Sequence, residues 1–278
     1  MVVGIYANKK KDIDLVNTKR FIDYLRKKNI ECIVSRHLTE DFPNFKCYDI
    51  EDVKMDLLTV FGGDGTILRA VKKAVSFDIP ILGINLGSLG FLDEVGKLSA
   101  EEALALILEG KYKIAKRSLI TLKHNNLEQI ALNDIVIRNA NREVSNVVKL
   151  EAYWDDYLID KFIADGIIIS TPTGSTAYSL SAGGPVLSPE LNALVITAIC
   201  PHTLHNRPIV VSNTKPVKIK LIDERAEVFA DGQLIAPLEV GCEIEICKSD
   251  KICQFISLSN QNFYNKLLNK LNKWSGIN

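Results

Sequence analysis

Strand-like and helix-like hydrophobic patterns alternate along the first hundred residues of the chain. Four short apolar runs predict buried strands: Val2–Ala7, Glu31–Ser35, Asp56–Phe61 and Pro80–Ile84. Helical spacing of apolar residues marks three other segments: the stretch that holds Leu15, Phe21, Ile22 and Leu25, then Thr66–Val75, then residues 99–110. Strands that alternate with helices indicate a parallel sheet covered on both faces. We therefore expect an α/β domain over residues 1–117.

The pattern changes near residue 118, where short apolar runs follow one another and helical periodicity almost disappears. Turn signals such as Asn125-Asn126, Asp155-Asp156 and Asp231-Gly232 separate the runs. The expected strands are Ser118–Lys123, Ile130–Arg138, Val147–Trp154, Tyr157–Phe162, Gly166–Ser170, Ala193–Cys200, Val217–Ile222 and Val240–Cys247. This succession predicts a second, β-rich domain over residues 118–250.

The tail, residues 251–278, returns to helical spacing between Phe263 and Trp274, with Lys266, Lys270 and Lys273 between the apolar positions. Such a helix either lies on a membrane surface or packs back on the protein. The short apolar face and the small number of lysines favour packing, and we expect the tail to return to the α/β domain.

Composition narrows the class of protein. The chain of 278 residues is 47% hydrophobic and 24% charged, with 34 basic and 34 acidic side chains, which is typical of a soluble globular protein. The charge balance disfavours a nucleic-acid binder, and no apolar run or leader pattern predicts a membrane span or export. We expect a cytoplasmic location. The six cysteines contain no C-x-x-C pair, so buried reduced thiols are favoured over a metal site or disulfides.

The segment Gly62–Thr66 (GGDGT) lies where a predicted buried strand turns into a helix, which is where parallel α/β sheets bind ligands. Glycines at 62, 63 and 65 let the backbone approach a phosphate, and the start of the helix offers N–H groups to it. Asp64 is unusual in an anion-accepting turn, and a general base is its natural role, with help to a metal ion as the second option. The alternative, equally weighted from this segment alone, is a structural Asp-Gly turn that caps the helix.

Two downstream segments have the composition of a site for a polar ligand. The stretch Asp165–Pro185 runs from a buried strand into a loop dense in hydroxyl groups: Ser170, Thr171, Thr173, Ser175, Thr176 and Ser179, with Tyr178 as an aromatic neighbour. Asn133 and Asp134 interrupt an apolar strand and need partners if they are buried. A ligand with ribose hydroxyls and amides fits both segments. A solvent-exposed loop and an exposed strand end are the alternatives.

In combination these segments resemble the NAD kinase family. The matching motifs are Gly62–Thr66, Leu86–Leu92 (LGSLGFL), Leu132–Asp134, Asp165–Pro185 and Pro201–Pro208, in the order of the family and over roughly residues 1–260. The first motif also occurs in lipid kinases related to diacylglycerol kinase and in phosphofructokinases. The resemblance implies an α/β domain followed by a β-rich domain, a site that draws on both, and a homodimer or homotetramer.

The resemblance also implies roles for particular residues. Asp64 is the expected general base, and the expected phosphate-binding group is Gly62, Gly63, Gly65 and Thr66. The residues expected to bind NAD are Asp64, Gly65, Arg69, Asn133, Asp134, Asp165, Thr176, Ala177, Tyr178, Ser179, Leu180, Ser181 and Gln233. Ile163 replaces an arginine found in some members, so the preferred donor stays open. His202, His205 and Arg207 match a family motif without an assigned role.

The expected reaction is transfer of a phosphoryl group from ATP, or another donor such as polyphosphate, to the 2′-hydroxyl of the adenosine ribose of NAD. A divalent cation, Mg²⁺, is expected to be held mainly by the donor's phosphates, without a metal site built from the protein. Two other classes stay open at this point: a lipid kinase that shares the GGDGT motif, and a dinucleotide-binding regulator without catalytic activity.

Overall fold

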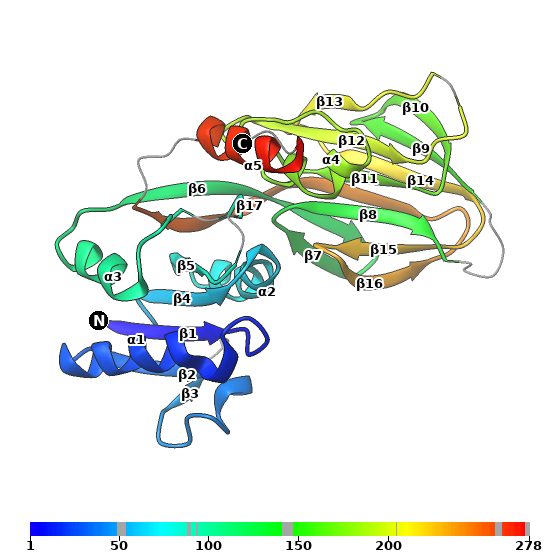
Figure 1. Cartoon of the computed structure of the whole chain (residues 1–278). Coiled ribbons are helices and arrows are strands. Elements are labelled where there is room, and N and C mark those ends of the chain that lie inside the picture. Colours follow the sequence, from blue (N-terminus) through cyan, green and yellow to red (C-terminus); the bar gives the residue numbers. More distant parts are fainter. Residues whose placement is uncertain are drawn as a thin grey trace. The chain divides into compact units, whose positions relative to one another are not determined.

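The computed structural model describes residues 1–48, 54–87, 90–92, 94–140, 147–203, 205–258 and 263–275. The chain divides into two compact units, one made of residues 1–116 and 252–278 and the other of residues 117–251 (Figure 1). The tail therefore belongs to the first unit. None of the helices in the described ranges is long and apolar enough to cross a membrane.

The first unit contains a parallel sheet in the order β5-β4-β1-β2-β3. Its strands are β1 (Val2–Ala7), β2 (Glu31–Ser35), β3 (Cys47–Tyr48), β4 (Leu57–Gly62) and β5 (Ile81–Asn85). The end of β17 pairs with β5 through Phe255 and Ile81. Strand order reverses at β1, since β2 lies on one side of it and β4 on the other. Ligands of open α/β sheets bind beside the carboxyl ends of the strands at such a reversal.

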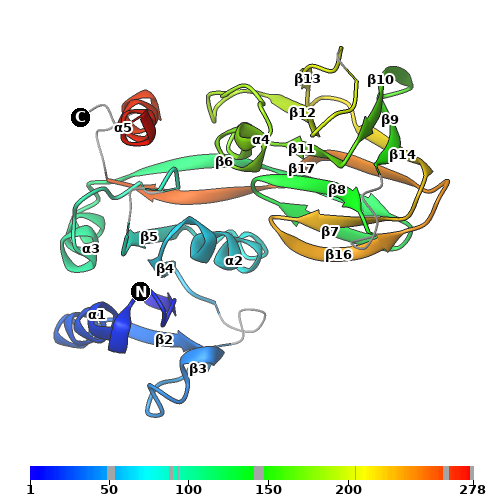
Figure 2. The same ribbon diagram turned by 45° about the vertical axis from the view of Figure 1, so that its right-hand side comes forward.

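Helices cover both faces of this sheet, which explains the unbroken apolar run of β4. Leu57 and Phe61 share a core with residues of α1 (Val16–Lys27) and α3 (Ala100–Leu108). Leu58 and Val60 alternate with them and point to the other face, where α2 (Asp64–Val75) packs against β4 and β5. Both views of the ribbon show α1 running beside β1 and β2 (Figure 2).

The second unit is built from antiparallel strands. One sheet has the order β13-β12-β11-β8-β15-β16, and its strands are β8 (Asp134–Asn139), β11 (Gly166–Ser170), β12 (Ala193–Ile199), β13 (Ile209–Ser212), β15 (Ala226–Ala230) and β16 (Gln233–Leu238). The other strands are β6 (Lys113–His124), β7 (Leu127–Ala131), β9 (Val148–Trp154), β10 (Tyr157–Ala164), β14 (Val217–Asp223) and β17 (Glu243–Ser257). The start of β6 and the end of β17 belong to the first unit. Alternate side chains of these strands form one buried core.

Several elements differ from the sequence expectation. The single strand expected over Ile130–Arg138 is two strands, because Leu132 and Asn133 turn their backbone N–H groups to the carboxylate of Asp231 at 2.9 and 2.7 Å. Strands β3, β13, β15 and β16 were not expected, and β17 runs to Ser257 rather than ending at Cys247. The hydroxyl-rich loop contains a 3-10 turn at Gly174–Thr176 and a short helix, α4 (Tyr178–Ser181).

The cysteines and the tail helix also depart from expectation. All six cysteines are free thiols, but Cys47 and Cys200 are exposed and only Cys253 is fully buried, so the prediction of buried thiols is wrong for these two. In α5 (Phe263–Ser275), Tyr264, Leu268 and Leu271 are exposed, whereas Lys266 is buried. The face that packs on the unit holds Phe263 and Leu267 together with Lys266, so it coincides only in part with the apolar face read from the sequence.

Candidate active site

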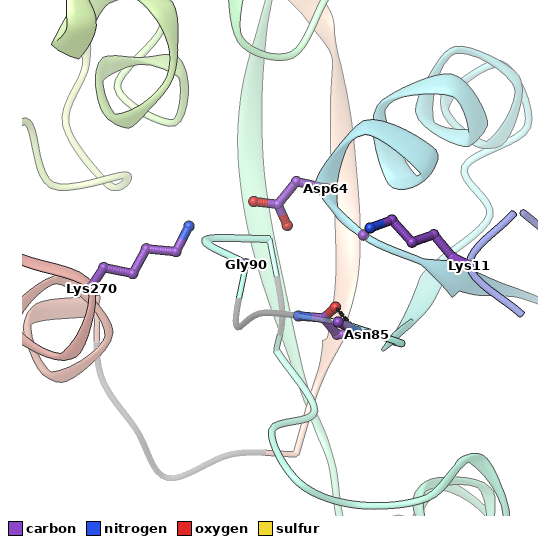
Figure 3. A pocket seen from close by; sticks show the side chains of 7 residues that line it. Lys11, Asp64, Asn85, Gly90 and Lys270 are labelled. Carbon is purple, nitrogen blue, oxygen red and sulfur yellow. Dashed lines mark hydrogen bonds between the residues drawn. The ribbon is translucent and has the colours of Figure 1, made fainter. Parts of the chain in front are cut away.

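A pocket of about 150 Å³ lies at the carboxyl ends of the central strands of the first unit (Figure 3). Lys11 follows β1, Asp64 follows β4 and Asn85 ends β5, so three neighbouring strands deliver polar side chains to one place. The full lining is Lys11, Gly63, Asp64, Asn85, Gly87, Gly90 and Lys270. Sites for whole drug-sized ligands measure roughly 300–1,000 Å³, so this pocket matches a phosphate-sized portion of a ligand.

Asp64 is the acidic group of the pocket and stands in the first turn of α2, behind the N-cap Gly63. Its Oδ2 accepts a hydrogen bond of 2.9 Å from the backbone N–H of Phe91. Its Oδ1 lies against Gly90, where a Cβ atom would overlap it. The carboxylate is thus oriented by the loop after β5 and stays partly exposed at the pocket, where it can accept a proton from a bound ligand.

The glycines of the GGDGT turn serve different purposes. A Cβ on Gly62 would collide with the side chain of Thr66, so packing requires glycine there. A Cβ on Gly63 or Gly65 would meet nothing within 4 Å, so the fold leaves space beside both residues. That open space beside a helix N-terminus suits the close approach of a phosphate.

Two lysines enter the pocket from elements that the sequence did not connect with Asp64. Figure 3 shows Lys11 and Lys270 approaching the carboxylate of Asp64 from opposite sides. Lys270 belongs to α5, and its ammonium lies 3.9 Å from the centre of the Phe91 ring. Partial burial lowers the pKa of Lys270, and the negative charge of Asp64 acts in the opposite direction.

The lining of the pocket offers oxygen ligands to a cation that arrives with phosphates. In the described part of the chain, no group of three or more His, Cys, Asp or Glu side chains is placed to hold a metal ion. The pocket lining holds Asp64 as its carboxylate and Asn85 as its amide. Mg²⁺ is commonly bound by one or two carboxylates together with substrate phosphates, so these residues fit the expected ion.

The second unit brings together another group of predicted residues. The carboxylate of Asp231 accepts backbone N–H groups of Leu132, Asn133 and Asp134. Thr171 binds the same segment, since its Oγ1 donates to the carbonyl of Leu132 at 2.6 Å and its N–H to that of Asn133 at 2.9 Å. Burial first, and then the charge of Asp231, raises the pKa of Asp134 to about 7. Asn133 and Asp134 therefore lie against the hydroxyl-rich loop.

Some hydroxyl groups of that loop form hydrogen bonds within the protein, and others are available to a ligand. Ser175 Oγ donates to the carbonyl of Pro172 at 2.7 Å, and Ser179 Oγ pairs with Thr197 Oγ1 at 3.0 Å. In the residues that the structure describes, the buried hydroxyls of Ser170 and Thr173 have no hydrogen-bond partner. A buried hydroxyl without a partner costs free energy, so a polar ligand or water is the expected partner of both.

The remaining residues of the loop lie at or near the surface. Thr176 and Ala177 are half-buried, as is Leu180, whereas Tyr178 and Ser181 are exposed. Tyr178 as a residue is 44% exposed, so this aromatic residue is accessible to a planar base. The alternative of an ordinary solvent-exposed loop is not supported, because Thr171, Thr173 and Ser175 are buried.

Register shows which predicted residues share one end of the six-stranded sheet. Asp134 pairs with Ser170, and Ala230 pairs with both Ile135 and Gln233, so Gln233 lies at the same end as Asp134. Asp165 precedes the opposite end of β11, roughly 17 Å away at 3.4 Å per residue, and is exposed. This unit alone therefore does not bring Asp165 to the others.

Four predicted residues of the first unit do not line the pocket: Gly62, Gly65, Thr66 and Arg69. Thr66 is buried, and its Oγ1 accepts a hydrogen bond of 3.0 Å from Asn8 Nδ2, so its side chain supports the turn and does not line the pocket. Arg69 is exposed on α2 and does not line the pocket either. The histidines of the Pro201–Pro208 motif have structural contacts: the N–H of His202 binds the carbonyl of Ile163 at 2.8 Å, and His205 lies 3.8 Å from Asp160.

Five lining residues were not predicted as site residues: Lys11, Asn85, Gly87, Gly90 and Lys270. Gly87 and Gly90 stand in the LGSLGFL motif, and a polar residue that ends an apolar strand is a usable signal for Asn85. Lys11 ends the basic run Lys9–Lys11, which has no specific signal for a site. Nothing in the local sequence of the tail distinguishes Lys270 from its neighbours.

Comparison with known proteins gives matches over nearly the whole chain. The model of the ATP-NAD kinase N-terminal domain matches residues 3–112, and that of the ATP-NAD kinase C-terminal domain matches residues 132–258. The NAD kinase of Methanothermobacter thermautotrophicus is 39% identical over 91% of this chain and 90% of its own. That of Caldanaerobacter subterraneus is 38% identical over 97% of this chain and 98% of its own.

Solved structures agree with the sequence matches. A crystal structure of yeast NADH kinase complexed with NADH has a TM-score of 0.86 at 27% identity and covers 100% of this chain and 88% of its own. An NAD kinase from Archaeoglobus fulgidus in complex with ATP has a TM-score of 0.76 at 26% identity and covers 98% of this chain and 99% of its own.

Fold, pocket and matches define a phosphotransferase with an α/β unit and a β-rich unit. Both domain models match in order, and relatives of the same kind cover more than nine tenths of the chain. The chain belongs to the NAD kinase family. The lipid-kinase alternative has no support from these matches.

Proposed function

We propose that this protein transfers the terminal phosphoryl group of ATP to the 2′-hydroxyl of the adenosine ribose of NAD and so forms NADP. The observation that carries the proposal is the carboxylate of Asp64, oriented by Phe91 at the edge of a basic pocket. The relatives solved with NADH and with ATP support a dinucleotide and a nucleoside triphosphate as the two ligands.

Asp64 acts as the general base. A ribose hydroxyl is a poor nucleophile, so Asp64 accepts its proton as the oxygen attacks the terminal phosphorus, and the bond to the leaving diphosphate breaks. Gly63 and Gly65, beside the open space at the start of α2, let backbone N–H groups approach the phosphates. Positioning and electrostatics account for most of the catalysis of phosphoryl transfer, so the fixed carboxylate and the nearby lysines are the relevant features.

We propose Mg²⁺ as the cofactor, carried on the donor's phosphates, with Asp64 as the carboxylate and Asn85 as the amide nearest to it in the pocket lining. When bound, such an ion neutralises charge on the phosphates and lowers the barrier to attack.

The second unit is proposed to hold the adenosine part of NAD. Asn133 and Asp134 present polar groups beside the buried, unpartnered hydroxyls of Ser170 and Thr173, within the described residues. Thr176, Ala177, Leu180 and Ser181 offer further contacts around Tyr178, whose ring is available for stacking. Gln233 lies at the same end of the sheet, two strands away from β8, and is a further candidate for contact with NAD.

A cytoplasmic location and a homodimeric or homotetrameric state complete the proposal. The edge strand β10 exposes the large side chains of Tyr157 and Leu158, at 73% and 47%, which supports a contact surface for a second copy. Asp165 stays a proposed NAD-binding residue, although it lies beyond the opposite end of β11 from Asp134. Light scattering of the purified protein tests the oligomeric state.

The decisive experiment incubates the purified protein with NAD, Mg²⁺ and one donor at a time, namely ATP, other nucleoside triphosphates or polyphosphate, and measures NADP. NADP formed with ATP supports the proposal. Transfer to diacylglycerol but not to NAD would point to a lipid kinase, and binding of NAD without transfer from any donor would point to a regulator.

A further inference from the structure

Helix α5 carries two lysines one turn apart on the face that packs against the first unit. Lys266 and Lys270 are spaced i, i+4 and therefore project in nearly the same direction. Lys266 is buried, and Lys270 is half-buried at the pocket, although both belong to a tail with exposed apolar residues. An ammonium group that loses hydration is stabilised by a nearby anion.

The first partner is Glu94. Its Oε2 lies 2.9 Å from Nζ of Lys266, and both side chains are more than nine tenths buried. Glu94 also accepts the N–H of Leu258 on its carbonyl at 2.9 Å and the hydroxyl of Ser257 on Oε2 at 3.3 Å. One residue therefore fixes both the end of β17 and the rotation of α5. A buried ion pair of this kind is well suited to define register.

Lys270 follows one turn later and reaches the pocket. Its ammonium lies 3.9 Å from the centre of the Phe91 ring, and the backbone of Phe91 is the group that orients Asp64. Figure 3 shows the side chain extended toward the carboxylate. The negative charge of Asp64 favours the charged form of Lys270 and so opposes the effect of burial on its pKa.

The balance of charge around the pocket favours an anion. Lys11 and Lys270 contribute two positive charges and Asp64 one negative charge. A lysine that gives up part of its hydration is stabilised when a ligand supplies negative charge, and lysine binds phosphate as a point charge. The terminal phosphoryl group of a nucleoside triphosphate carries such negative charge. During transfer this charge is spread over the three equatorial oxygens of the group.

We propose that Lys270 contacts the phosphoryl group that is transferred, so that the C-terminal helix supplies a catalytic residue to the pocket of Asp64. This inference rests on the proposed function for the identity of the reaction. The alternative is a purely structural role, in which the ammonium packs on Phe91 and no phosphate touches it.

The test uses the full chain with Lys270→Met, Lys270→Gln and Lys270→Arg, and Lys19→Met as the matched control. Lys19 is exposed on α1 and does not line the pocket. Circular dichroism first establishes which variants are folded. Met keeps the apolar packing on Phe91 and Gln keeps a polar side chain, and the test needs only one of these two uncharged variants to fold. Three quantities are then measured: kcat/KM for ATP, the Kd for inorganic tripolyphosphate by calorimetry, and the Kd for NAD.

We expect Lys270→Met to lower kcat/KM for ATP about 100-fold, which corresponds to about 2.7 kcal/mol. The same variant should weaken the binding of tripolyphosphate by about 10-fold or more. Lys270→Arg should recover part of both losses, and NAD binding should stay within about twofold of the wild type. A Lys270→Met protein that matches Lys19→Met in both quantities would overturn the inference.

The two proposals fail separately in this design. If the wild type forms no NADP but tripolyphosphate binding still depends on Lys270, the proposed reaction is wrong and the phosphate contact stands. If the wild type forms NADP and the Lys270 variants behave like the control, the reaction stands and the contact is wrong.

Discussion

The backbone N–H of Phe91 donates a 2.9 Å hydrogen bond to Oδ2 of Asp64, across 27 residues of sequence. This bond joins the loop after β5 to the first turn of α2 and fixes the direction of the carboxylate. The ring of the same phenylalanine lies under Lys270. Phe91 thus connects the proposed base to the tail helix.

Replacing Asp64 by Asn should lower kcat by about 10²–10⁴-fold while NAD still binds. The amide oxygen of Asn can accept the N–H of Phe91, so the loop keeps its position while the base is lost. NADP formation and calorimetric binding of NAD measure the two effects. Turnover near that of the wild type would remove Asp64 from the mechanism.

Gly90→Ala should disturb the site and the fold together. Its Cβ would overlap Oδ1 of Asp64, so the carboxylate or the loop must move. We expect a loss of roughly 1–3 kcal/mol in the free energy of unfolding and a fall in kcat of at least about 10-fold. Urea unfolding and steady-state kinetics measure these effects. Full stability together with full activity would show that the loop adjusts without cost.

Gly65→Ala makes the same substitution at a glycine where the added Cβ meets no protein atom. A Cβ there meets nothing within 4 Å, and alanine is a better helix former than glycine by roughly 0.5–1 kcal/mol. The variant should be at least as stable as the wild type but should bind ATP or NAD more weakly, because the methyl group enters space kept for ligand. Unchanged binding and turnover would contradict a close approach of phosphate at this residue.

Breaking the ion pair of Lys266 and Glu94 should lower the unfolding free energy far more than breaking a surface ion pair does. Lys266→Met leaves the carboxylate of Glu94 buried without its cation and should cost about 3–5 kcal/mol of unfolding free energy. Glu94→Gln combined with Lys266→Met should recover much of that loss. The control is Lys46→Met in the pair with Glu31, where the side chains are 80% and 52% exposed and at most about 1 kcal/mol is expected.

Denaturant unfolding gives both free energies, and hydrogen exchange of α5 shows whether the helix has detached. Equal losses for Lys266→Met and Lys46→Met would mean that the buried pair does not hold the tail.

Asp134 should make stability depend on pH. Its pKa is raised to about 7 in the folded protein from an ordinary value of 3.8, so above pH 4 the folded state holds a proton that the unfolded state has lost. The contribution of Asp134 to stability is therefore present at low pH and is lost as the pH rises from about 4 through 7. The steepest slope is about 1.4 kcal/mol per pH unit.

Asp134→Asn removes this titration, so the difference in unfolding free energy between the wild type and the variant should shift in favour of the variant as the pH rises. Urea unfolding at pH 5, 6, 7 and 8 measures the difference. A constant difference over that range would place the pKa of Asp134 outside it.

Local patterns predicted much of the fold. The strands and helices predicted in residues 1–110 agree closely with β1, β2, β4, β5 and the three α-helices α1, α2 and α3. The antiparallel strands with the clearest alternation, such as β9 and β11, were also found. Strands β15 and β16 were missed because Glu227 and Pro237 weaken their patterns, and their pairing with β8 depends on contacts distant in sequence.

The sequence by itself determined the two kinds of unit, the glycine turn with its lone acid, and the hydroxyl-rich loop, because turn chemistry and hydrophobic period are local properties. Only the tertiary structure decided which residues surround Asp64. Lys11, Phe91 and Lys270 reach it because strand order reverses at β1 and because a buried ion pair sets the rotation of α5. Both causes act between residues distant in the chain, so no local pattern carries them.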